Sequence, residues 1–143
     1  MRDLFNNLGL SVAIPAAAYD ADNTPAAIDL QGFEGALVAI SVGAGGITFS
    51  GTNKIEFKLT HSDDDSSYVA VTDADVQGLA SVGAGGIILA LTSAHASASV
   101  TKVGYVGGKR YLKLLADFSG THGTATPIAA TVIKGHAHNR PVA

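Results

Sequence analysis

The sequence predicts an all-β protein, an antiparallel β-sandwich or barrel of about eight short strands. Polar and apolar residues alternate along short segments, and Gly, Pro, Asn, Asp and Ser separate those segments. No long stretch with the 3.6-residue period of a helix lies between them. Of 143 residues, 17 are Gly, 47% are hydrophobic and 15% are charged, which is typical of a folded domain with tight turns.

The clearest strand signal is the strict alternation of polar and apolar residues over 54–60, which predicts a half-buried strand. Residues 111–118 repeat this alternation. Gly107-Gly108 precede that second segment, so we expect a hairpin that joins it to a strand over 100–106.

Residues 36–42 are apolar on both faces and lie between glycines, as a central strand covered on both sides would. Further short strands are expected between turn residues, over 10–14, 26–30, 68–71, 87–91 and 128–134. One short helical turn is expected, capped by Thr72 and stopped by Gly78. The heptapeptide Ser-Val-Gly-Ala-Gly-Gly-Ile occurs at 41–47 and again at 81–87, which we interpret as two similar exits from a strand into a glycine loop.

The length corresponds to a single β domain over residues 1–143. We interpret 1–9 as an extended N-terminal arm, 10–135 as the β body and 136–143 as a C-terminal tail. Chain ends commonly order only when a partner holds them. The residues expected to anchor the ends on another subunit or on a partner protein are Leu4, Phe5, Leu8 and Arg140.

Charge and composition exclude several classes of function. A net charge of −3 argues against nucleic acid as a partner, and we interpret the basic stretch 109–113 as the solvent face of a strand. The absence of an 18-residue apolar run argues against a membrane, and the first residues lack the pattern of a secretory signal, so synthesis in the cytoplasm without export is expected. Without Cys the chain can form no disulfide and no thiolate site.

Two clusters contain potential metal ligands. Residues 63–67, Asp-Asp-Asp-Ser-Ser, resemble the start of a calcium loop, but Tyr68 and Ala74 stand where such a loop needs Gly and Glu, which favours an ordinary hairpin turn. His136 and His138 have the spacing of a metal-binding pair without a third ligand, so we interpret them as part of an exposed tail. The other histidines, in turn-like sequence, are expected to be solvated: His61, His95 and His122.

The sequence contains no complete catalytic motif of the kinds considered. Thr52 follows Gly46–Gly51 where a phosphate-binding loop needs Lys, and no Gly-x-Ser-x-Gly nucleophile elbow occurs. The chain has two Glu: Glu56 lies between lysines, and Glu34 lies in a glycine-flanked turn. We therefore expect that the protein is not an enzyme and that it binds no cofactor.

Several segments resemble small structural proteins encoded in the head gene clusters of tailed bacteriophages and prophages. These segments are 1–7 (MRDLFNN), 29–33 (DLQGF), 61–64 (HSDD), 103–112 (VGYVGGKRYL) and 134–141 (KGHAHNRP). The resemblance implies a virion component, a capsid decoration or cement protein on the capsid surface. Its implied partners are the major capsid protein and further copies of itself in a homotrimer. Two alternatives stay open, a tail or head–tail connector subunit and a carbohydrate-binding β-sandwich.

Overall fold

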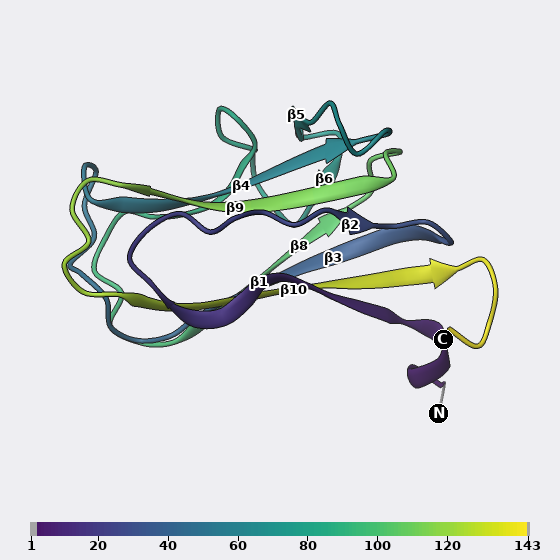
Figure 1. The fold of residues 1–143 in the computed structure, drawn as a ribbon, viewed down its shortest axis with the longest axis horizontal. Coiled ribbons are helices and arrows are strands. Elements are labelled where there is room, and N and C mark those ends of the chain that lie inside the picture. Colours follow the sequence, from purple (N-terminus) through teal and green to yellow (C-terminus); the bar gives the residue numbers. More distant parts are fainter. Residues whose placement is uncertain (1–2, 143) are drawn as a thin grey trace.

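The structure is a computed structural model that describes residues 3–142. Two antiparallel sheets of five strands pack face to face, which confirms the all-β prediction as a sandwich and excludes a closed barrel (Figure 1). Sheet A has the order β1 (Gly9–Tyr19), β10 (Thr126–Ala137), β3 (Phe33–Val42), β8 (Ser99–Tyr105), β6 (Val76–Gln77). Sheet B has the order β2 (Ile28–Asp29), β9 (Tyr111–Ser119), β4 (Lys54–Ser62), β5 (Val69–Ala70), and β7 (Ile87–Leu91) also pairs with β4.

The core lies between the sheets and follows from the alternation along each strand. Ile55, Phe57 and Leu59 of β4 are completely buried, as the alternation over 54–60 predicts. From sheet A, Val38 and Ile40 of β3 join the same cluster. Burying one such side chain fully is worth about 1.5–3 kcal/mol, so these rows supply the main driving force for folding.

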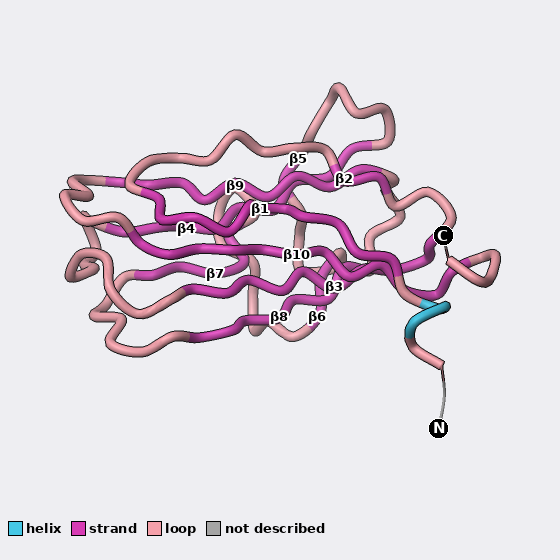
Figure 2. Tube along the Cα trace, turned by 60° about the horizontal axis from the view of Figure 1, so that its bottom comes forward, coloured by secondary structure: helices cyan, strands magenta, loops and turns pink. Residues whose placement is uncertain are grey.

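Both ends of the chain lie at the same end of the sandwich (Figures 1 and 2). The N-terminal segment contains a 3-10 turn, η1 (Phe5–Asn7), and β1 begins at Gly9. At the other terminus β10 runs to Ala137, two residues into the expected tail, and the backbone N–H of Val142 donates to the carbonyl of Asn6 at 3.1 Å. The N-terminal arm and the C-terminal tail therefore contact each other. Positions 1, 2 and 143 of the expected arm and tail lie outside the described residues.

The expected hairpin over 100–118 is wrong, because β8 belongs to sheet A and β9 to sheet B. Residues 106–110 cross between the sheets instead of turning within one. The backbone N–H groups of Val106 and Gly107 both donate to the carbonyl of Asp75, at 2.8 and 3.2 Å, and the carbonyl of Arg110 accepts from the N–H of Leu30 at 2.8 Å. The crossing segment thus bonds to the residue before β6 of sheet A and to the residue after β2 of sheet B.

The expected helical turn at Thr72 is also wrong. Residues 72–75 form a turn in which the Asp75 N–H donates to the Thr72 carbonyl at 3.0 Å, and β6 begins at once with Val76. The Asp75 carboxylate accepts from both the backbone N–H and the hydroxyl of Thr72, each at 2.8 Å. The Thr72 hydroxyl donates to that carboxylate, and since the chain continues at once as β6, the turn does not extend into a helix.

The repeated heptapeptide contains two glycine pairs, and all four glycines have positive φ. Gly45 and Gly46 have φ of +107° and +84°, and Gly85 and Gly86 have φ of +78° and +85°. The first pair follows β3, as expected, but the second precedes β7, so only the first is a strand exit. In each pair the second glycine lies close to a strand: a Cβ at Gly86 would lie 2.4 Å from the carbonyl oxygen of Leu59.

Candidate interaction surface

The outward faces of the two sheets differ in chemistry. Sheet B presents a mainly charged face, in which Lys54 pairs with Glu56 at 2.5 Å and Lys58 pairs with Asp117. Sheet A presents a mainly apolar face, and its outward side chains include Leu10, Val12, Leu37, Ala39, Val100, Ala129 and Ile133, with Lys102 among them. A sandwich needs no apolar residues on its outer side, so this asymmetry points to contact with another molecule.

The apolar face is continuous across the strands. The register places Leu10 of β1 opposite Ile133 of β10, and Ile133 opposite Leu37 of β3. The sequence predicts a β3 covered on both sides, yet in the described part of the chain no third layer packs on this side, and Leu37 and Ala39 stay partly exposed. The expectation of a doubly covered strand is therefore wrong for the chain by itself.

A groove of about 470 Å³ lies on this face. Three glycines from adjacent strands line it, Gly135 of β10, Gly35 of β3 and Gly104 of β8. A Cβ at Gly35 would meet only ordinary contacts, at 3.7 and 3.8 Å, so the missing side chains leave open space above the backbone. The groove is further lined by Leu8, Ala36, Leu37, Gln77, Tyr105, Val106, Ile133 and His136.

The N-terminal segment projects from the end of the sandwich (Figure 1), and its Leu8 lines this groove. We call residues 3–8 the hook. Leu4 is 68% exposed and Phe5 is 89% exposed, although hydrogen bonds hold the segment: the N–H of Asn7 donates to the Leu4 carbonyl at 3.2 Å. Leu8 is half-buried, and its Cδ2 would lie 3.7 Å from a Cβ on Gly135. The hook therefore presents two apolar side chains to water from a defined backbone.

The structure brings three of the four predicted anchor residues together. Leu4, Leu8 and Arg140 line one surface hollow of about 600 Å³, in which Asp3, Asn7, Gly135 and His136 also take part. Phe5 does not line this hollow. The remaining apolar residues of the face could be found only from strand pairing, because a single exposed Leu or Val is normal in any sequence.

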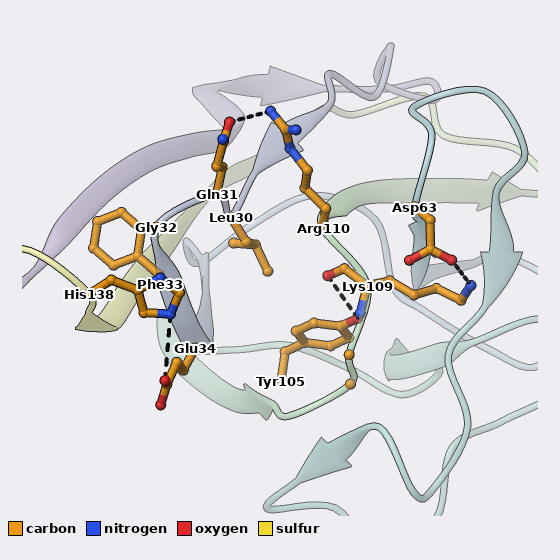
Figure 3. A pocket seen from close by; sticks show the side chains of 12 residues that line it. Leu30, Gln31, Gly32, Phe33, Glu34, Asp63, Tyr105, Lys109, Arg110 and His138 are labelled. Atoms are coloured by element: carbon orange, nitrogen blue, oxygen red, sulfur yellow. Dashed lines mark hydrogen bonds and ion pairs between the residues drawn. The ribbon is translucent and has the colours of Figure 1, made fainter.

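A further pocket of about 410 Å³ lies where β2, β3 and the 106–110 crossing meet (Figure 3). Its charged side chains pair with carboxylates. Lys109 Nζ lies 2.6 Å from Asp63, and Arg110 donates to both oxygens of Asp29 at 2.8 and 2.6 Å. The Arg110 guanidinium holds the pKa of Asp29 down at about 2. Two cations of the basic stretch 109–113, Lys109 and Arg110, thus pair with this chain's own carboxylates.

Two cationic side chains lie over tyrosine rings. The guanidinium carbon of Arg110 lies 4.8 Å from the centre of the Tyr111 ring, and Lys113 Nζ lies 4.0 Å from that of Tyr68. Sugar-binding sites usually stack the ligand on an open aromatic ring. At these two tyrosines one ring face is already occupied.

His61 is buried, so the expectation of a solvated side chain is wrong. It is the next inward residue after Leu59 on β4, and its Nδ1 lies 2.9 Å from the hydroxyl of Tyr105. The Tyr105 hydroxyl also accepts from the backbone N–H of Lys109 at 3.2 Å. Burial lowers the pKa of His61 below its ordinary value, which favours the neutral ring. His95 and His122 are half-buried, each near a backbone carbonyl.

The segment 63–67 forms a hairpin turn between β4 and β5, as predicted. The Asp64 carboxylate accepts from the backbone N–H groups of Ser66 and Ser67 at 2.9 and 2.8 Å, and these bonds lower its pKa to about 2. His138 lies 3.5 Å from Glu34, and the described residues contain no group of three or more His, Asp or Glu arranged to hold a metal ion.

Within residues 3–142, no helix is long and apolar enough to cross a membrane. The chain matches no protein-family model and no curated protein. The surface itself therefore carries the functional argument.

Proposed function

We propose that this protein is a non-enzymatic structural component of a tailed-phage head, a decoration protein that binds the outer surface of the capsid. Its partners are the major capsid protein and further copies of itself, in the homotrimer that the sequence resemblance implies. The single observation that carries the proposal is the asymmetry of the sandwich, with one charged face and one mainly apolar face beside an exposed hook.

This asymmetry suits a protein that attaches to other proteins. The exposed apolar residues of sheet A and the hook are Leu4, Phe5, Leu10, Val12, Val100 and Val106. At about 100 Å² for each large side chain, they expose on the order of 600 Å², at the upper end for a monomer. A standard interface takes about 800 Å² from each partner, so this surface can supply much of one.

The test is the copy number of the protein in purified virions, measured by quantitative gel against the major capsid protein. A decoration protein occupies repeated positions on an icosahedral shell, so hundreds of copies for each particle are expected. A count of about a dozen would indicate a connector ring instead. Absence from particles would refute a virion role altogether.

A matched variant links the count to the surface. Val12→Lys places a charge on the apolar face at a position that is exposed, so the sandwich itself should fold. Val69→Lys makes the same change on β5 of sheet B and serves as the control. We expect particles to lose the first variant and to keep the second.

A further inference from the structure

We propose that copies of this chain associate by hook exchange: Leu4 and Phe5 of one copy lie in the glycine-floored groove on sheet A of the next. The occupant of the groove is thus a second copy of this chain. This contact does not depend on the virion role.

The groove fits an apolar, uncharged occupant. Its lining residues include no Asp, Glu, Lys or Arg, and the floor is glycine backbone rather than side chains. A cavity of about 150 Å³ accepts a benzene ring, so a groove of about 470 Å³ admits the ring of Phe5 together with a leucine side chain. The tip of the hook, Leu4-Phe5, likewise carries no side-chain charge.

The hook does not fill its own groove. Leu8 forms part of the groove's lining. Before Leu8 in the sequence, the turn η1 leads the chain away from the groove, so Leu4 and Phe5 at the tip stay in water. The backbone N–H of Val142 donates to the Asn6 carbonyl, which ties this turn to the C-terminal segment. A hook held in this position loses little conformational entropy on binding, and this favours docking.

The arrangement allows a closed assembly. The hook extends from β1 at one edge of sheet A, whereas the groove floor lies on β10, β3 and β8. The tip of the hook and the floor of the groove are different patches, so two copies can exchange hooks reciprocally, or the contacts can run head to tail and close into a ring when the rotation permits. The flanking apolar residues Leu10 and Val12 add area, and the charge-poor face carries little to repel a second copy.

The test measures the mass of the full chain in solution by sedimentation equilibrium. The native protein should sediment as an oligomer. The double variant Leu4→Ser/Phe5→Ser should weaken association more than a hundredfold, because two large apolar contacts are lost. Gly35→Val should do the same from the other side, since it fills the groove floor without a close contact. The matched controls are Val69→Ser on sheet B and Gly51→Val in an open loop, and both should associate like the native chain.

Mixing the two interface variants distinguishes hook exchange from any other contact. The serine variant keeps its groove and Gly35→Val keeps its hook, so each is a monomer alone but the mixture should form a pair. Thermal melting of each variant confirms that it is folded. A monomeric native chain, association that survives the hook variant, or a mixture that does not pair would overturn the proposal. If the protein is a monomer in solution but is present in particles, hook exchange is wrong and the decoration role stands. If the protein is an oligomer in solution but is absent from particles, the decoration role is wrong and hook exchange stands.

Discussion

Replacing Asn23 with alanine should strongly destabilise the sandwich. Asn23 is buried in the segment that links β1 to β2, and it lies beside the part of β9 that the short strand β2 does not reach. Its side-chain amide donates to the carbonyl of Leu114 at 3.2 Å and accepts from the N–H of Ala116 at 2.7 Å. One side chain thus performs the pairing that a neighbouring strand would otherwise provide.

The size of the effect follows from the groups left behind. Asn23→Ala leaves one buried N–H and one buried carbonyl without partners, and each such group costs about 1–3 kcal/mol. A loss of about 2–6 kcal/mol is therefore expected, a large part of the 5–15 kcal/mol that typically separates folded from unfolded protein. Asn23→Asp keeps the acceptor for Ala116 but places a carboxylate against the Leu114 carbonyl, so it should also destabilise the fold.

Urea denaturation followed by circular dichroism measures this change. The midpoint should fall while the slope stays constant, because the surface exposed on unfolding is unchanged. Asp20→Ala, an exposed residue in the same segment, is the matched control and should shift stability by less than about 0.5 kcal/mol. If Asn23→Ala also stayed within that range, the reasoning that Asn23 closes the edge of β9 would be refuted.

Three further predictions test the fold and its electrostatics. Gly86→Ala should cost about 1–3 kcal/mol more than Gly85→Ala in the same urea assay, because both glycines have positive φ but only Gly86 lies against the Leu59 carbonyl; equal losses would contradict this. Burial lowers the folded-state pKa of His61, so as the pH falls the unfolded chain binds a proton at this residue before the folded chain does. The free energy of unfolding should therefore fall as the pH drops below about 6.5, and His61→Gln should reduce this pH dependence. An unchanged pH dependence in the variant would contradict this. Calcium and a chelator should give the same melting midpoint, because the Asp64 carboxylate already accepts backbone N–H groups, and a shift of several degrees would show a calcium site.

Strand positions could be predicted from the sequence where burial follows a two-residue period. The alternation that identifies Ile55, Phe57 and Leu59 as inward continues to His61, so the same pattern contained the signal for the buried histidine. The neighbouring Ser62-Asp63 are typical of a turn, so the local sequence favours a turn at His61 over a continued strand.

Sheet membership could not be predicted, because it depends on pairing between residues far apart in the chain. Gly107-Gly108 are typical of a hairpin, yet the segment crosses between sheets, where Gly107 packs against the ring of Tyr105. One sequence signal indicated the apolar outer face: residues 36–42 are apolar on both sides of the strand, although only one side can face the core. Leu10 and Val100 become parts of the same surface only once β1, β10, β3 and β8 lie side by side.

The proposal that this protein decorates the outside of a phage head is tested most directly by electron cryomicroscopy of purified particles. We expect repeated density on the outer surface of the shell that accommodates the two-sheet sandwich, with hooks joining neighbouring copies. A shell with no such density, or the sandwich found only in the tail or connector, would contradict the claim.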